Sequence, residues 1–197
     1  MSYARKLQLT ALALGALALA TGTATWSAFS DQNQNGANTF ASGTVKLEEN
    51  DDGATMLSLS NATPGQSVQR CIELDYEGSL NASLRHFASV SGALGPYLTL
   101  TVTRGTESKP DFADRCSTFT ADSTGYGNNA PGVIYRGALS AYPATYATGI
   151  VDPIADTPET WSTNEKHSYR YMVSVNNDYG AQGLSATATF TWEARNL

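Results

Sequence analysis

The residue types that carry most protein chemistry are scarce in this sequence. It holds only two histidines, His86 and His167, and two cysteines, Cys71 and Cys116. A zinc site usually takes three or four such ligands at short spacings, which these four do not have. His86 lies within a strand-like run, where we expect a surface or edge position, and His167 precedes a strand, where we expect a solvated side chain. No HExxH, GxSxG, GxGxxG or P-loop motif occurs, so we predict no catalytic residue, no metal site, no cofactor and no enzymatic activity.

Carboxylates gather at one turn, where Glu48, Glu49, Asp51 and Asp52 follow one another closely. Clustered carboxylates bind Ca²⁺ in EF-hands, but the 12-residue EF-hand pattern is absent. We expect a solvated turn here and leave Ca²⁺ binding open. The whole chain carries a formal charge of −6 without a basic cluster, which excludes the class of nucleic-acid-binding proteins.

The first 28 residues have the order of a secretory signal peptide. Arg5 and Lys6 give a positive start, an uncharged Leu/Ala stretch covers residues 7–20, and small residues follow. This stretch is shorter than the roughly 20 apolar residues of a membrane-spanning helix, although an uncleaved anchor remains the alternative. Cleavage after Ala20, Ala24 or Ala28 is compatible with the pattern. With cleavage after Ala28 the mature chain has 197 − 28 = 169 residues and a formal charge of −6 − 2 = −8.

The two cysteines, Cys71 and Cys116, both lie in the mature part. An even cysteine count in an exported chain favours a disulfide. Such a bond would close a loop of about 46 residues and contribute about 4 kcal/mol in the chain-entropy model. Two buried free thiols, or half of a metal site, are the alternatives.

Alternation of apolar and polar residues predicts strands throughout the mature chain and no helix. In the run Leu98–Arg104, for example, Leu98, Leu100 and Val102 share one face. We expect a long loop over Ala141–Thr160, with room for one helical turn. The predicted strands are Phe40–Leu47, Thr55–Leu59, Ser67–Tyr76, Ser83–Val90, Leu98–Arg104, Val133–Leu139, Ser168–Val175 and Leu184–Trp192. Many short strands at even spacing indicate an all-β antiparallel sandwich or barrel.

Several motifs keep a distinctive order between Ala24 and Leu80. They are the junction Ala24–Asp31 (ATWSAFSD), the strand Thr39–Leu47 (TFASGTVKL), the turn Pro64–Gln66 and the break Glu77–Leu80. In these motifs, and in the last strand Gln182–Arg195, the sequence resembles the TasA/camelysin family of exported bacterial fibre proteins. The region from about Val90 to Glu165 does not align. Gln66 replaces the usual acid of the turn, and the two cysteines have no counterpart in TasA.

The resemblance implies a jelly-roll-like β-sandwich, residues 40–197, after a signal peptide, residues 1–28. A SipW-type signal peptidase would cut between Ala28 and Phe29. The mature chain would be secreted to the extracellular matrix or cell surface and polymerise head-to-tail into biofilm-matrix fibres, with an anchoring subunit as a further partner. An N-terminal arm, residues 29–39, would insert as a donor strand into the next subunit.

The arm is apolar only at its start, so we expect it to have little reason to pack on its own domain. Its main chain can still satisfy the open sheet edge of a neighbouring copy. The predicted donor-strand residues are Phe29, Ser30, Asp31, Gln32, Asn33, Gln34, Asn35, Gly36, Ala37 and Asn38.

Two other classes of function stay open. Camelysin is described as a metallopeptidase, so a metal-dependent surface protease is one alternative. A monomeric secreted binding module is the other, and the aromatic residues Trp161, Tyr142 and Tyr146 would serve it if they are exposed.

Overall fold

The computed structural model describes residues 30–34, 45, 47–50, 57, 63–114, 116–127, 129–154 and 157–197. The predicted signal peptide and its cleavage site between Ala28 and Phe29 lie outside these residues. So do arm residues 35–39, Asp51 and Asp52 of the acidic turn and, except for Leu57, the strand predicted at Thr55–Leu59.

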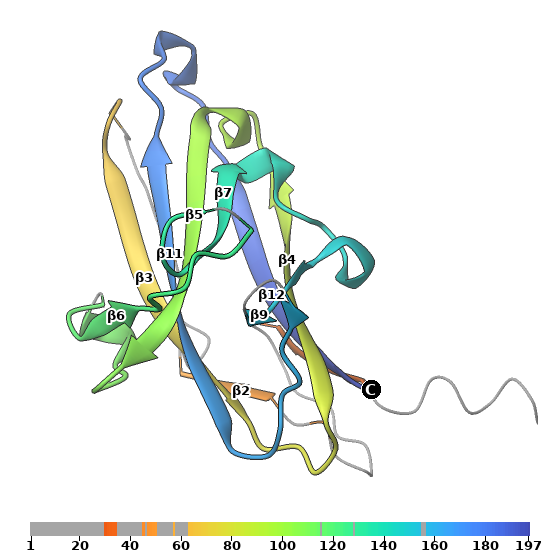
Figure 1. The fold of residues 1–197 in the computed structure, drawn as a ribbon. Coiled ribbons are helices and arrows are strands. Elements are labelled where there is room, and N and C mark those ends of the chain that lie inside the picture. The colour runs from red at the N-terminus through yellow and green to blue at the C-terminus, as the bar shows by residue number, and fades with distance from the viewer. Residues whose placement is uncertain are drawn as a thin grey trace, which may run out of the picture.

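The described part of the chain is built from strands in two antiparallel sheets that face each other (Figure 1). A four-stranded sheet has the order β1-β12-β4-β8, and a six-stranded sheet has the order β2-β3-β11-β5-β6, with β7 also pairing with β5. The strands are β1 Ser30–Gln34, β2 Leu47–Glu49, β3 Ser67–Tyr76, β4 Ala82–Ser91, β5 Leu98–Glu107, β6 Phe119–Ala121, β7 Val133–Ala138, β8 Ile150–Val151, β9 Pro153–Ile154, β10 Thr157–Pro158, β11 Glu165–Val175 and β12 Thr187–Asn196. The predicted all-β antiparallel sandwich is therefore confirmed.

The strand pairing is nested in the manner of a jelly roll. The first strand, β1, pairs with the last, β12, and β3 pairs with β11. Inside these pairs, β4 pairs with β8 and β5 pairs with β7. A long hairpin folded over on itself gives this order, which is that of an eight-stranded jelly roll. Strands β2 and β6 are additional members of the larger sheet.

The core lies between the sheets and follows the alternation of the long strands. On β11, Tyr169, Tyr171, Val173 and Val175 are buried, as the sequence predicts. Other side chains from both sheets, such as Trp192 of β12, and Trp161 from the segment before β11 complete the core. Because side chains alternate across a strand, one register places every apolar residue of a strand inside.

Five short 3₁₀ turns appear in the described residues, where the sequence predicts at most one. They are η1 Gly95–Tyr97, η2 Phe112–Asp114, η3 Leu139–Ala141, η4 Tyr146–Thr148 and η5 Tyr179–Ala181. The predicted long loop at Ala141–Thr160 also holds the two-residue strands β8, β9 and β10. Pairs of this length are too short for the alternation pattern to detect.

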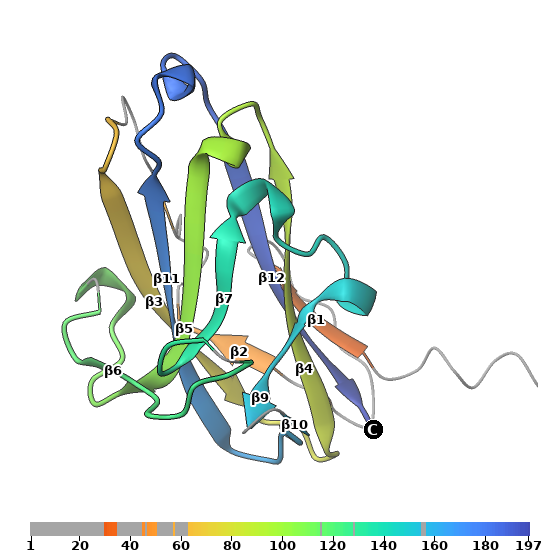
Figure 2. The ribbon, with the colours of Figure 1, turned by 45° about the horizontal axis from the view of Figure 1, so that its top comes forward.

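The N-terminal arm differs from its prediction. Its described part is β1, which lies on its own domain along β12, from Ser30 opposite Arg195 to Gln34 opposite Thr191. Figure 2 shows β1 beside the end of β12 that leads to the C-terminus. The expectation that the arm does not pack on its own domain is therefore wrong for residues 30–34. Main-chain pairing at a sheet edge needs no apolar side chains, which is why the polar sequence SDQNQ forms this strand.

Candidate functional site

A charged network is buried at one end of the sandwich interior, and Arg104 is its centre. Arg104 continues the inward face of β5 after Leu98, Leu100 and Val102, so its side chain points between the sheets. Its main chain is fixed on both sides: its N–H donates to the carbonyl of Gly132 at 2.8 Å, and its carbonyl accepts from Asp122 N at 3.1 Å.

Three carboxylates surround the Arg104 guanidinium. Its Nη1 donates to Asp122 Oδ2 at 2.7 Å, its Nε lies 3.0 Å from Asp152 Oδ1, and its Nη2 pairs with Glu159 Oε2. Tyr126 joins the network through its hydroxyl, which donates to Asp122 at 2.7 Å. These residues come from the segments after β6, after β8 and after β10, so the network ties the connections at this end to β5.

His167 completes the network from the neighbouring strand β11. Its Nε2 lies 2.8 Å from Arg104 Nη2, 3.1 Å from Glu165 Oε1 and 3.4 Å from Glu159 Oε2. The edge of Trp161 contacts the imidazole, with ring centroids 4.8 Å apart. The expectation of a solvated His167 is therefore wrong, because its position on β11 is in phase with the buried Tyr169 and Tyr171.

The network perturbs the ionisation of its members. Burial raises the pKa of Asp152 to about 6, in spite of the Arg104 charge. Burial also acts to raise the pKa of Glu159, but its hydrogen bond with His167 and the charge of Arg104 lower it to about 2. For His167, burial opposes protonation, yet the hydrogen bond with Glu159 prevails and raises the pKa of the imidazole. The two carboxylates thus titrate far apart, as a buried acidic pair beside one cation does.

Asp152, Glu159 and His167 have the donor set of a metal site, because one ligand atom from each lies within 4.8 Å of the others. Histidine and carboxylates of this kind bind zinc at about 2.0–2.2 Å. The Arg104 guanidinium, however, contacts all three, so an ion at that distance would meet its nitrogens and its charge. The site as folded therefore does not fit a metal ion, and no chemistry is derived through one.

His86 lies deeper between the sheets and is not the surface or edge residue that the sequence suggested. Its side chain is fully buried on the inward face of β4. Its Nδ1 is 2.9 Å from the hydroxyl of Tyr171, which also accepts a hydrogen bond from Trp192 Nε1 at 2.8 Å. Burial, with a contribution from Arg104, lowers the pKa of His86 to about 3, so the imidazole is neutral near pH 7.

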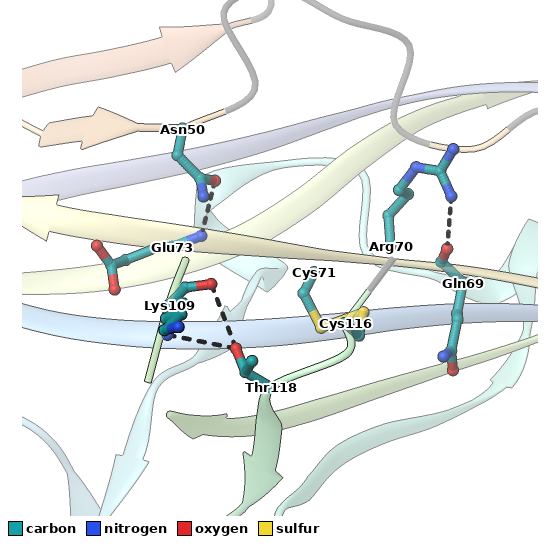
Figure 3. The surroundings of a disulfide bond; sticks show 8 residues. All are labelled: Asn50, Gln69, Arg70, Cys71, Glu73, Lys109, Cys116 and Thr118. Carbon is teal, nitrogen blue, oxygen red and sulfur yellow. Dashed lines mark hydrogen bonds between the residues drawn. A yellow bond between two sulfur atoms is a disulfide. The ribbon is translucent and has the colours of Figure 1, made fainter. Parts of the chain in front are cut away.

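The predicted disulfide between Cys71 and Cys116 is present, with Cα atoms 5.2 Å apart. Cys71 lies on β3 and Cys116 lies in the loop before β6 (Figure 3). Thr118 holds the same loop through hydrogen bonds with the main chain of Lys109. The bond therefore fixes the β5–β6 connection to β3, which is two strands away in the sheet.

The aromatic residues suggested for a binding module do not form an exposed platform. Trp161 is fully buried, and its Nε1 donates to Asp152 Oδ2 at 3.0 Å. Tyr142 is also buried, and its ring packs edge-on against Tyr135 and Phe190. Tyr146 is half-buried under the guanidinium of Arg195, 3.8 Å from the ring centroid.

Sequence reasoning missed Arg104, Asp122, Asp152 and Glu159 as site residues. They are scattered over the chain and follow no motif spacing, so only the fold brings them together. One signal was present: Arg104 stands in the inward phase of an otherwise apolar strand, where a charged residue needs partners.

The fold and the buried network define the chain as an all-β jelly roll whose first strand closes the edge of the four-stranded sheet. Residues 3–91, a little under half of the chain, match the family model described as camelysin metallo-endopeptidase. Over these residues the chain is similar to the camelysin family, which confirms the resemblance inferred from the sequence. No curated protein matches the chain.

The family description corrects the expectation that the chain has no enzymatic activity, because it is that of a metallo-endopeptidase family. The matched residues include β1 to β4 and His86 but none of the Arg104 network. Among the residues that the structure describes, no helix has the length and apolar composition of a membrane span.

Proposed function

We propose that the mature chain is a secreted subunit of extracellular matrix fibres, in which the N-terminal arm of one subunit pairs with β12 of the next. The observation that carries this proposal is the pairing of β1 with β12 over five residue positions at the edge of the four-stranded sheet. A second copy of the arm presents the same main chain, so it satisfies the same edge without any new kind of contact.

The edge itself supports the proposal. Without β1, residues Thr191 to Arg195 of β12 pair only with β4, and the main-chain groups on their other side have no partner strand. An exposed row of this kind is a template for another strand. In the single chain β1 fills the edge, and exchange of identical segments between copies is a low-cost route to assembly. Because donor and acceptor lie on different parts of the subunit, the exchange propagates head-to-tail.

Export and cleavage belong to the same proposal. Cleavage between Ala28 and Phe29 by a SipW-type signal peptidase would free Phe29 as the first residue of the arm. From Phe29 to Thr39 an extended strand spans roughly 36 Å, at about 3.3 Å per residue. That length is enough to reach across a neighbouring domain of this size.

The test uses proline in the arm. Successive N–H groups alternate between the two sides of a strand, so either Gln32 or Asn33 directs its N–H toward β12. The mature variant Gln32→Pro/Asn33→Pro removes that donor whichever residue supplies it. We expect it to stay folded and form no fibres in negative-stain electron microscopy.

The matched control is Gln32→Ala/Asn33→Ala, which changes the same side chains and keeps both N–H groups. We expect it to form fibres like the unaltered protein. If the proline variant polymerises equally well, pairing of the arm does not build the fibre.

The family description supports a second candidate function, a cell-surface metallo-endopeptidase. Hydrolysis of casein by the mature protein, measured with and without a chelator, tests it. Chelator-sensitive hydrolysis that persists in the proline variant would establish a peptidase that does not depend on polymerisation.

A further inference from the structure

We propose that the Arg104 guanidinium takes the place of a divalent cation in a ligand set that is otherwise complete, so that removing this one side chain converts the network into a metal site. The inference goes beyond the proposed function, because no residue of the network lies in the arm or on β12. It concerns only Arg104 and the three residues with ligand-like spacing, Asp152, Glu159 and His167.

The three ligand atoms all face the guanidinium. Asp152 Oδ1 lies 3.0 Å from Nε, His167 Nε2 lies 2.8 Å from Nη2, and Glu159 Oε2 pairs with the same Nη2. They converge on one cationic group in the way that ligands converge on an ion. A planar guanidinium provides several N–H donors at the positions where a metal would provide coordination.

The surroundings orient these ligands as second-shell residues orient the ligands of a metal. Trp161 Nε1 holds Asp152 Oδ2 at 3.0 Å, which leaves Oδ1 for the cation. The Trp161 ring also packs edge-on against His167. Such outer contacts fix the direction of a ligand before the cation is present. Two of the three ligands, Asp152 and His167, are therefore held by a group other than Arg104.

The negative charge of the network exceeds the single positive charge of Arg104, which favours a cation of higher charge. With Asp122, Asp152 and Glu159 ionised, and with His167 deprotonated as a metal ligand must be, the sum is −3 + 1 = −2. Loss of Arg104 raises the excess to −3 around a buried centre. Unpaired buried carboxylates are costly, and a divalent ion offsets most of that charge. Zn²⁺ suits the mixture of one imidazole and two carboxylates, and it leaves a fourth position open.

The experiment compares the mature protein with Arg104→Ala, both stripped with a chelator and then titrated with Zn²⁺. For the unaltered protein we expect no binding heat in calorimetry and no change in Tm. For Arg104→Ala we expect a Tm lower by about 10 °C and 1:1 binding of Zn²⁺. At a 100-fold excess over Kd, Zn²⁺ should restore about 5–10 °C.

Two matched variants identify the site. Arg104→Lys keeps a cation in the network and should show no response to Zn²⁺. Arg104→Ala/His167→Ala lacks one ligand and should lose the Zn²⁺ response that Arg104→Ala gains. Arg104→Gln keeps most of the side-chain volume and carries the test if Arg104→Ala is not folded without metal.

Either of two results overturns the inference. One is 1:1 Zn²⁺ binding by the unaltered protein that His167→Ala abolishes, because the ligands would then take a metal with Arg104 in place. The other is that neither Arg104→Ala nor Arg104→Gln gains Zn²⁺-dependent stability, including the case in which both stay unfolded at saturating Zn²⁺.

Discussion

His86 lies between the two sheets with its Nδ1 near the Tyr171 hydroxyl, and its Nε2 has no hydrogen-bond partner. The ring also packs edge-on against Tyr169 at 4.5 Å between centroids. A second proton on this imidazole finds no hydrogen-bond acceptor at Nε2 among the described residues. Burial therefore lowers the pKa of His86 to about 3, and the folded state accepts only the neutral form.

This histidine makes the fold sensitive to acid. The unfolded chain binds a proton at His86 near pH 6.5, while the folded chain resists it down to about pH 3. The unfolded state therefore holds more protons between these pH values, and the free energy of unfolding falls as the pH falls, by about 1.4 kcal/mol per pH unit. We expect His86→Phe to flatten this dependence, as measured by urea unfolding at pH 7.5 and pH 5.

His167 serves as the control, because its pKa is shifted in the opposite direction to that of His86. The pKa of His167 is raised, so protonated His167 stabilises the fold at low pH and this contribution is lost as the pH rises through its folded pKa. The variant His167→Gln should therefore lose more stability at pH 5 than at pH 7.5. An unaltered pH slope in His86→Phe would contradict the assignment of the acid sensitivity to His86.

At the residue scale, the sequence predicts part of which side chains are buried and form the candidate site. Alternation placed Tyr169 and Tyr171 inside, and the same phase places His167 beside them. The partners of Arg104 were beyond reach, because Asp152 and Glu159 lie in short segments without a period. A charged network becomes visible only when the positions of the connecting segments are known.

At the scale of elements, the disulfide holds the β5–β6 connection on the outer side of the six-stranded sheet. Cys71 is buried although it is out of phase with the inward-facing Ile72 and Leu74, so the loop that carries Cys116 covers it. Arg170 of β11 packs over the Phe119 ring at 5.0 Å from its centroid and anchors the end of the same loop. The disulfide, this contact and the Thr118 hydrogen bonds with Lys109 together hold the loop on the sheet.

We expect Cys71→Ala/Cys116→Ala to lower the free energy of unfolding by about 2–4 kcal/mol, because the unfolded chain regains the entropy of a loop between residues 45 positions apart. Urea unfolding of the variant and of the reduced natural protein should agree. Chymotrypsin should also cut after Phe112, in the same connection, faster in both than in the oxidised protein. A loss below about 1 kcal/mol with unchanged cleavage would contradict this role.

Long strands were predictable and short ones were not. Ser67–Tyr76 is predicted and observed with the same bounds, since its alternation extends over ten residues. The strands β6, β8, β9 and β10 have two or three residues each, and β1 is polar throughout. These strands form because a neighbouring strand offers main-chain partners, and nothing in their own sequence indicates that neighbour.

At the scale of the whole molecule, β1 and β12 pair at one edge of the four-stranded sheet. A subunit whose arm pairs with another subunit therefore exposes its own β12, which can then accept an arm. Two assemblies satisfy this rule: a closed pair that exchanges arms, and an open chain in which each arm moves to the next subunit. Both use identical pairings. The two assemblies differ in how their size changes when a subunit without an arm is added. Such a subunit can accept an arm on β12 but cannot donate one.

A mature protein that lacks residues 29–38 is such a subunit. We expect it to stay folded and monomeric alone, with β12 open. Mixed at one part in ten with the full mature chain, it should end each growing fibre that it joins, so the mean length falls to the order of 10 subunits. Gln32→Ala/Asn33→Ala, mixed in the same ratio, should leave the length unchanged. Negative-stain images give the length distributions.

The same mixture separates the two assemblies. In a closed exchanged pair the arm-less subunit only replaces one member, so particle size stays constant as its fraction rises. In an open chain the mean length falls in inverse proportion to that fraction, because each accepted arm-less subunit leaves no arm for the next. Fibres whose length does not change with the arm-less fraction would show that polymerisation uses another surface.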